Sequence, residues 1–290
     1  MSIDVAVKQK TFGNKTMPLE VILGENLHYG NFVNDQLNIG ELGDTEFIAY
    51  HPEHIGRGFS VIWNPREKKK IELRLPQPST AQELSDFYAA VERTAKHWNA
   101  KLIVDGSNVR LSDFLAGFSN MIEFNDRIIK HFAQQVLDGE HETLTLYSAR
   151  WPLAIGKDEA SAFIENTREY ALWLHKKQAV NAHYAIARFY ANKNSISARY
   201  TFTNGISCIF PREPAVPFGA TDPSTGRALQ CSDWKVCLGI DGEAEPLGEI
   251  EYAEFINRIP ADKLLKYDGN KIQILEMSEN EVRELIRSER

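Results

Sequence analysis

The alternation of apolar and polar residues is clearest between Arg57 and Gly106, where it predicts a hairpin, a helix and a strand. Two short segments alternate with the period of a half-buried sheet, and Asn64-Pro65 between them predicts a turn. A short buried strand is expected over 102–104. The apolar positions of the hairpin are Phe59, Val61, Trp63, Ile71, Leu73 and Leu75.

Helical spacing of apolar residues predicts three long amphipathic helices and a short one at the C-terminus. The first begins at Thr80 and Glu83, which have capping-box spacing, and extends to Trp98. The second spans about 112–137, before Asp138-Gly139, and the third spans about 158–178. The short helix covers 278–287. The apolar stripes are Leu84, Phe87, Tyr88, Val91, Ala95 and Trp98; Phe114, Leu115, Phe118, Met121, Ile122, Ile128, Ile129, Phe132 and Val136; and Phe163, Ile164, Ala171 and Leu174.

The remaining segments predict strands and turns. Residues 2–50 are expected to form short strands, and the apolar run 18–23 belongs to this region. Asn204-Gly205 lies between two alternating segments and predicts a hairpin, because both turn residues accept a positive φ. A further turn is expected at 192–194. Later strands are expected over 143–148, 184–190, 196–203, 206–210, 234–240 and 271–275. The fold class is therefore α+β, with antiparallel sheets and hairpins, three long helices and a short C-terminal helix.

A chain of 290 residues is long enough for one large domain or two ordinary ones. We expect two α+β halves, 1–155 and 156–290, divided near Gly156. One continuous domain is the alternative, because the third helix has an apolar stripe that could pack on either sheet.

Composition narrows the classes of partner. The formal net charge is −7, and the densest basic run, Arg66 with Lys68–Lys70, falls at a predicted turn, so nucleic-acid binding is not expected. The N-terminus has no signal-peptide pattern and no segment is apolar enough to span a bilayer. Three cysteines do not form a disulfide framework. These features predict a soluble cytoplasmic protein with reduced thiols.

One long irregular segment, residues 211–232, is rich in Pro and Gly and has little apolar periodicity. Connections of this length are uncommon in compact domains and commonly have a function. We expect this segment, called the contact loop below, to touch a protein partner through Arg212, Asp222 and Arg227. Cys231, near its end, is a further candidate of the contact loop. The sequence leaves open whether its thiol is exposed and reactive, and nothing in it indicates a lowered pKa.

The candidates for chemistry are few. His51-Pro52-Glu53-His54 is the densest group of ligand-type side chains, although its spacing matches no metal motif. Asp105 follows a buried strand, where ligands often bind, but Asp105-Gly106 is equally a turn sequence. No nucleotide-binding, hydrolase or metalloprotease motif is present. No cofactor and no metal are therefore expected, and no catalytic residue is assigned.

Three stretches resemble a family of uncharacterised bacterial proteins of about this length, associated with Gram-positive and gut bacteria. They are NGISCIFPREPAVPFGATDPSTGRALQCSDW, which begins at Asn204, MPLEVILG at 17–24 and IELRLP at 71–76. The resemblance covers the whole chain. It implies a bacterial cytoplasmic protein with a domain of unknown function, and it carries over no site residues.

Three functions remain open. The first is a binding or accessory protein that acts through protein contacts, which the lack of a catalytic signature favours over an enzyme. The second is an enzyme whose site is assembled from distant carboxylates and histidines, such as Asp105, His51 and His54. The third is a small-ligand sensor with an apolar pocket near the aromatic strands. Those strands contain Tyr184, Phe189, Tyr190, Tyr200 and Phe202. The oligomeric state and the identity of a partner are left open.

Overall fold

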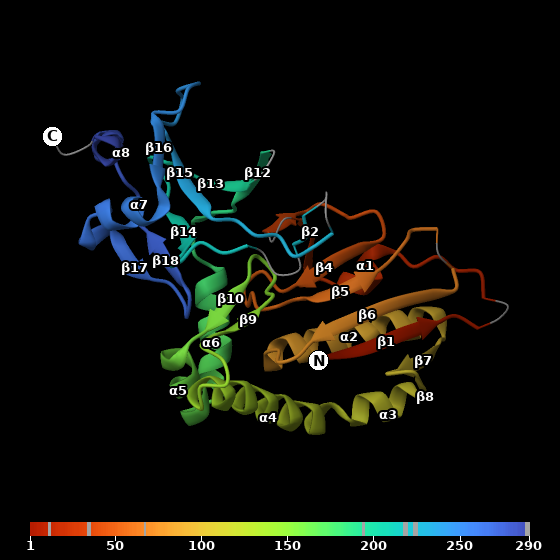
Figure 1. Cartoon of the computed structure of the whole chain (residues 1–290). Coiled ribbons are helices and arrows are strands. Elements are labelled where there is room, and N and C mark those ends of the chain that lie inside the picture. The colour runs from red at the N-terminus through yellow and green to blue at the C-terminus, as the bar shows by residue number, and fades with distance from the viewer. Residues whose placement is uncertain are drawn as a thin grey trace. The chain divides into compact units, whose positions relative to one another are not determined.

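The computed structural model describes residues 1–10, 13–33, 36–66, 68–192, 195–216, 220–222 and 226–287 (Figure 1). The chain divides into two compact units, Met1–Val180 and Asn181–Arg290. Both units combine helices with sheets, so the predicted α+β class is confirmed. None of the described helices is long and apolar enough to cross a membrane.

The first unit is built on an eight-stranded sheet in which every neighbouring pair is antiparallel. The predicted hairpin of β5 and β6, joined across Asn64-Pro65, is confirmed. In spatial order the strands are β3 (Gln36–Ile39), β2 (His28–Val33), β4 (Glu46–Tyr50), β5 (Phe59–Ile62), β6 (Lys70–Pro76), β1 (Ser2–Lys8), β7 (Lys101–Val104) and β8 (Ser107–Val109).

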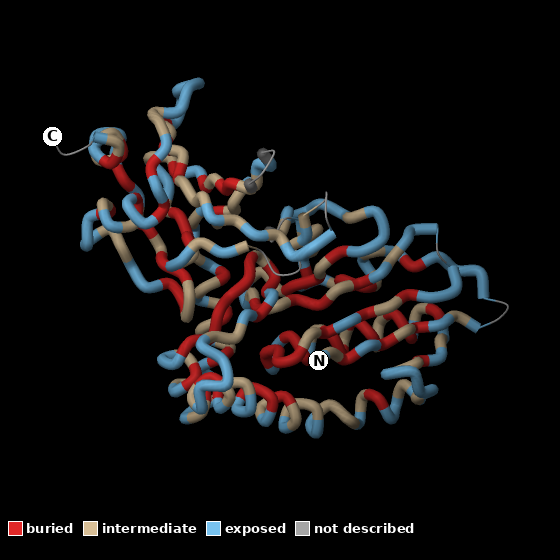
Figure 2. Tube along the Cα trace, in the orientation of Figure 1, coloured by how far each residue is buried: buried red, intermediate tan, exposed pale blue. Residues whose placement is uncertain are grey.

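The two faces of this sheet differ in chemistry because side chains alternate along each strand. Val5 and Leu73 are paired across β1 and β6 and are both buried, whereas Asp4 and Arg74 are paired on the opposite face and exposed. Helix α2 (Ala81–Trp98) covers the apolar face (Figure 1), and buried residues recur along its length (Figure 2). The other face, called the polar face below, carries charged and small side chains.

A capping box starts α2, as predicted. The Thr80 hydroxyl accepts a hydrogen bond from the Glu83 N–H at 3.0 Å, and the Glu83 carboxylate accepts one from the Thr80 N–H at 2.8 Å. The Glu83 carboxylate also accepts from the main-chain N–H groups of Arg57 and Gly58. One buried side chain therefore fixes both the start of α2 and the residues before β5.

The three long helices are α2, α4 and α6, of 18, 20 and 11 residues. Two predicted helices are interrupted. The segment expected over 112–137 forms α3 (Leu111–Ala116) and α4 (Phe118–Leu137), which meet at Gly117, and α4 ends at Asp138 as expected. The segment expected over 158–178 forms α5 (Lys157–Glu165) and α6 (Arg168–Gln178), because Asn166 is extended and its side chain accepts from the Arg168 N–H. The hairpin of β9 (Leu144–Leu146) and β10 (Leu153–Ile155) lies between α4 and α5.

The apolar run 18–23 is helical, so the expectation of a strand there is wrong. It forms α1 (Leu19–Leu23), which ends at Gly24 with φ +65°. Arg93 of α2 donates to the carbonyls of Val21 and Ile22 at 3.1 and 2.7 Å. These bonds satisfy carbonyl groups at the end of a short helix, and the tertiary contact outweighs local preference.

The second unit contains two four-stranded sheets and two helices. One sheet has the order β12 (Arg188–Asn192), β13 (Ser195–Thr203), β15 (Asp233–Gly239) and β16 (Gly248–Glu251). The other has the order β11 (His183–Tyr184), β14 (Cys208–Pro211), β18 (Lys271–Ile274) and β17 (Leu264–Lys266), which follows a 3₁₀ turn at Ala261–Lys263. Helices α7 (Tyr252–Arg258) and α8 (Glu279–Ile286) also belong to the unit. The predicted C-terminal helix is confirmed by α8, which begins with a capping box between Ser278 and Glu281.

The predicted hairpin at Asn204-Gly205 is wrong. The strands on either side, β13 and β14, belong to different sheets, and β13 pairs with β15 in parallel. Gly205 has φ +73° as expected, but its N–H donates to the Met277 carbonyl at 2.9 Å. The Asn204 side chain accepts from the Asp241 N–H at 2.7 Å. The sequence therefore turns here, and these distant partners direct the chain to another sheet.

The antiparallel pair of β12 and β13 matches the strand pairing expected around 192–194, although Lys193 and Asn194 of that turn lie outside the described residues. The aromatic residues of these strands differ in burial. Tyr200 and Phe202 are buried and contact Phe210, whereas Tyr190 is 49% exposed.

The compact units differ from the halves expected from the sequence. Helices α5 and α6 lie within the first unit, and the Tyr170 hydroxyl donates to the Pro78 carbonyl at 2.9 Å. Phe163 of α5 is buried against the ring of Tyr170, and Leu174 is buried on the same helix as Tyr170. The division near Gly156 stays a prediction about independent folding.

A comparison of two fragments tests which division describes folding. We expect residues 1–180 to unfold in one cooperative transition. Fragment 1–155 should be far less stable, because it lacks buried side chains such as Phe163 and Tyr170, each worth about 1.5–3 kcal/mol. Thermal unfolding followed by circular dichroism provides the measurement. Equal stability of the two fragments would instead support the division near Gly156.

Candidate functional site

A cavity of about 380 Å³ opens on the polar face of the first unit's sheet. It lies over β2, β4, β5 and β6 and beneath the segment that follows β9. Its lining mixes basic, acidic, hydroxyl and apolar side chains. The lining residues are Asn31, Phe32, Glu46, Phe47, Ile48, Arg57, Gly58, Ser60, Arg74, Pro76, Tyr147 and Ser148.

The hollow exists because the middle strand carries almost no side-chain volume there. Ser60 of β5 is paired with Ile48 of β4 on one side and with Arg74 of β6 on the other. Gly58 comes two residues earlier and has φ +67°. A Cβ at Gly58 would lie 2.6 Å from Cγ2 of Ile48, so no larger residue fits without movement. Longer side chains on both neighbouring strands thus surround a low floor.

Two hydrogen bonds hold the segment after β9 over the floor. The Ala149 N–H donates to the Gly56 carbonyl at 3.0 Å. Arg57 donates from Nε to the Tyr147 carbonyl at 2.8 Å and from Nη1 to the Pro78 carbonyl at 3.1 Å. The guanidinium is therefore fixed in place by neutral acceptors, which leave its positive charge beside the cavity.

Glu83 supports this arrangement from beneath. Its carboxylate is buried and accepts from the N–H groups of Arg57, Gly58 and Thr80. Burial raises the pKa of Glu83, although these three hydrogen bonds and the charge of Arg57 act to lower it. The position of Arg57 thus depends on a carboxylate in the first turn of α2.

Several polar groups around the cavity have no partner among the described residues. The Ser148 hydroxyl is buried and makes no hydrogen bond with the part of the chain that the structure describes. Arg57 Nη2 has no acceptor within the described chain, and the Glu46 carboxylate pairs with no described cation. Arg74 uses Nε for Ser2 and Asp4, at 3.1 and 3.2 Å. Buried polar groups are normally satisfied, so an unpaired hydroxyl here favours an additional bound species.

A second polar cluster in the first unit contains two of the sequence candidates. The rings of His51 and His54 are 4.9 Å apart between centroids, and His54 is 6.1 Å from His175 of α6. The Glu53 N–H donates to Nδ1 of His51 at 3.2 Å. His175 is not among the sequence candidates, because it lies on a helix far along the chain and only the fold brings it beside His54.

Asp86 of α2 lies close enough to His51 and His54 to interact with them electrostatically. Its Oδ1 accepts from Gln82 at 3.0 Å, while Oδ2 is buried without a partner among the described residues. Burial raises the pKa of Asp86, and Gln82, the two histidines and Arg93 act against that rise. Across the described ranges, no three His, Cys, Asp or Glu side chains are grouped so that they could hold a metal ion.

Asp105 is not brought together with the histidines. It occupies the tight turn between β7 and β8 with φ +46°, and Gly106 follows with φ +82°. Its Oδ1 accepts from the Asp4 N–H at 3.2 Å, and its own N–H donates to the Asp4 carbonyl at 3.0 Å. These bonds give Asp105 a structural part at the edge between β1 and β7.

The contact loop is held at both ends within the second unit. The Tyr252 hydroxyl donates to the Pro211 carbonyl, and the Arg212 N–H donates to the Asn270 carbonyl at 2.8 Å. Asp222 and Arg227 are joined by a main-chain bond of 2.8 Å. Arg212 and Arg227 are exposed, whereas Asp222 is half-buried. Residues 217–219 and 223–225 lie outside the described structure.

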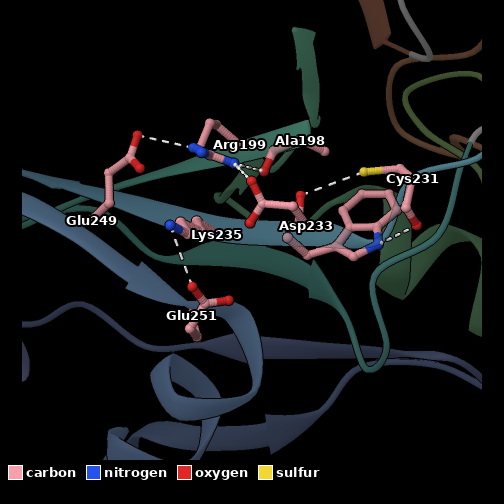
Figure 3. A network of polar contacts seen from close by, with 8 residues as sticks. Ala198, Arg199, Cys231, Asp233, Lys235, Glu249 and Glu251 are labelled. Atoms are coloured by element: carbon pink, nitrogen blue, oxygen red, sulfur yellow. Dashed lines mark hydrogen bonds and ion pairs between the residues drawn. The ribbon is translucent and has the colours of Figure 1, made fainter. Parts of the chain in front are cut away.

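Cys231 lies beside a network of charged side chains (Figure 3). Its thiol donates to the Asp233 carbonyl at 3.4 Å, and its carbonyl accepts from Trp234 Nε1 at 3.1 Å. Arg199 joins Asp233 and Glu249 at 3.2 and 2.9 Å. Burial raises the pKa of Cys231, which acts against formation of the thiolate.

The geometry defines an α+β protein with a chemically mixed cavity on the polar face of its large sheet. The family model described as "Domain of unknown function (DUF4299)" matches residues 2–285, and the chain belongs to this family. The family resemblance seen in the sequence is therefore confirmed. A search of curated proteins found no match. A search of solved structures also found none.

The unpartnered oxygen of Asp86 gives a pH-dependent prediction. The Asp86→Asn variant should be more stable than the wild type at pH 7, by about 0.5–1 kcal/mol, because it removes a desolvated charge. The gain should shrink as the pH falls toward about 4. A carboxyl group with a raised folded-state pKa stabilises the wild type only once it is protonated.

Urea unfolding of both proteins across this pH range provides the measurement. The exposed carboxylate of Asp44 offers a matched control, because Asp44→Asn should change stability little at any pH. A gain from Asp86→Asn that grows on acidification would contradict the prediction.

Proposed function

We propose that this protein is a binding protein whose first unit holds a small molecule in the cavity over Gly58 and Ser60. The observation that carries the proposal is a cavity of ligand size, about 380 Å³, beside a fixed guanidinium whose Nη2 has no acceptor among the described residues. Ligand pockets commonly span about 300–1,000 Å³ and combine apolar walls with a few oriented polar groups. This pocket differs from the apolar one expected near the aromatic strands of the second unit.

The arrangement around Arg57 supports binding rather than simple surface charge. Arg57 is half-buried, and carbonyl groups hold two of its nitrogens at 2.8 and 3.1 Å. A fixed side chain loses little conformational entropy when it meets a ligand, which favours affinity. The plain alternative is that Arg57 acts only as a neighbour of Glu83 and that water fills the cavity.

A protein-contact function is a second candidate, and the contact loop supports it. The loop is anchored at Pro211 and Arg212, while two of its arginines are exposed. An anchored, exposed loop can meet a partner with little loss of order. In this proposal Arg212 and Arg227 contact acidic groups of a protein partner, Asp222 contacts a donor group of the same partner, and Cys231 lies near the end of the loop.

An enzyme function has less support. The cluster of His51, His54, His175 and Asp86 supplies groups for acid–base chemistry, but none of the four lines the cavity. A general base must reach the proton that it removes.

Bacterial origin and a cytoplasmic location form part of the proposal. The family resemblance supports bacterial origin. The three cysteines are unpaired, and Cys208 is buried in the second unit's core, which is compatible with a reducing compartment.

Filling the cavity tests the small-ligand function. Native mass spectrometry of the wild type, incubated with a protein-free extract of host cells, should show a non-covalent small-molecule adduct. The Ser60→Phe variant should lack it, because a large side chain would occupy the floor of the cavity. Ile62→Phe is the control, since Ile62 lies on the same strand and is exposed outside the lining. A wild type without an adduct, or an adduct that survives Ser60→Phe, would disprove the proposal.

Charge reversal tests the protein-contact function. The double variant Arg212→Glu and Arg227→Glu should lose capture of its partner from host lysate by about tenfold or more, while its melting temperature stays unchanged. Affinity capture with quantitative mass spectrometry gives the measurement, and Lys130→Glu, at an exposed position of α4, is the control. Undiminished capture by the double variant would remove the loop from this function.

A further inference from the structure

The charges around the cavity are of both signs, and they lie on opposite sides of its floor. Glu46 belongs to β4, and Arg74 belongs to β6. Arg74 is paired with the short Ser60 of β5, whereas Glu46 is paired with Ile62, two residues further along β5, so the two charges lie diagonally across the floor. Neighbouring strands are about 4.8 Å apart, so the main chains of β4 and β6 are separated by about 10 Å. Long side chains from the two strands can therefore reach toward one small ligand from opposite sides.

The basic side of the cavity has unused donors. Arg57 keeps Nη2 without a described acceptor, and its bonded nitrogens face neutral carbonyls. Arg74 donates to Ser2 and pairs with Asp4 through Nε alone. Its two terminal nitrogens have no acceptor among the described residues. A guanidinium group presents parallel N–H donors that match a carboxylate. This side of the cavity suits a ligand carboxylate.

The acidic side has an unused acceptor. Glu46 forms no ion pair with any cation in the described ranges, although Lys70 and Glu72 pair nearby at 2.5 Å on β6. A carboxylate accepts hydrogen bonds and cannot donate them when ionised. Its natural ligand group is a cation such as a primary ammonium.

The remaining wall is apolar. Phe32, Ile48 and Pro76 line the cavity beside these charges. A volume of about 380 Å³ lies within the range for ligand pockets and is sufficient for a compact ligand. The wall suits a compact hydrocarbon side chain next to the two charged groups.

We propose that the cavity binds a free α-amino acid with an apolar side chain. Arg57 and Arg74 hold its carboxylate, Glu46 holds its ammonium group, and Phe32 and Ile48 contact its side chain. This inference rests on the proposed small-ligand function. The simpler alternative is an apolar carboxylic acid, in which case Glu46 is only a solvated charge at the rim.

Matched ligands distinguish these readings by isothermal titration calorimetry. L-Leucine carries both charges, 4-methylpentanoate lacks the ammonium group, and isoamylamine lacks the carboxylate; L-phenylalanine and L-methionine extend the panel. We expect at least one of the amino acids to bind. For leucine, each truncated analogue should bind about 10- to 100-fold more weakly, because it leaves one charged side chain without its partner.

Variants assign the contacts. Glu46→Gln should make leucine and 4-methylpentanoate bind with similar affinity, because the contact to the ammonium group is lost. Arg74→Gln should weaken both of these ligands and leave isoamylamine unchanged. Glu72→Gln is the control, since Glu72 lies on the same face but outside the cavity lining. It should bind leucine as the wild type does.

The outcomes separate this inference from the proposed function. Equal affinity of wild-type protein for 4-methylpentanoate and leucine would show a carboxylic-acid site and overturn the amino-acid inference. Failure of all the amino acids to bind would also overturn it. If the extract still yields an adduct that Ser60→Phe removes, the small-ligand function survives that failure. If the extract yields no adduct, both fail.

Discussion

The buried carboxylate of Glu83 is the interaction on which the first unit's site depends. It satisfies the first turn of α2 through Thr80 and also receives the N–H groups of Arg57 and Gly58. A helix N-terminus has unpaired N–H groups, and a nearby loop normally satisfies its own. Here one side chain serves both, so the loop before β5 has little freedom to move away from the helix.

The two residues whose N–H groups bind Glu83, Arg57 and Gly58, also line the cavity, so Glu83 fixes part of the cavity wall. Gly58 supplies the low floor, and Arg57 supplies the wall and holds the segment at Tyr147. Because both are fixed from beneath by Glu83, the cavity is preorganised before any ligand arrives. The raised pKa of Glu83 shows that burial outweighs the stabilising contacts of its ionised form. A protonated Glu83 would retain fewer acceptor positions for these N–H groups, so the site and the charge state of this residue are connected.

Local features of the fold were predictable from the sequence, whereas features that depend on distant partners were not. Both capping boxes and the β5–β6 hairpin follow from spacing within a few residues. Helix α1 was missed because Arg93, far along the chain, satisfies its carbonyls. The turn at Asn204-Gly205 was recognised, but its partners Met277 and Asp241 decide which sheet the next strand joins.

The cavity could not be predicted from the sequence either, because it depends on how β4, β5 and β6 pair with one another. Ser60 and Gly58 are unremarkable small residues in the sequence, and only the pairing with Ile48 and Arg74 turns them into a floor. Of the sequence candidates, His51 and His54 do lie together, and His175 and Asp86 join them from two helices.

The alternation of side chains along β4, β5 and β6 has a consequence for how this family can diversify. Phe47, Val61 and Leu73 point into the core, while Glu46, Ser60 and Arg74 between them face the cavity. A substitution at Glu46, Ser60 or Arg74 therefore leaves the packing beneath α2 almost untouched. In the proposed binding function, selectivity for a ligand and stability of the fold would be encoded by separate, interleaved positions on these strands, so the first could change without loss of the second.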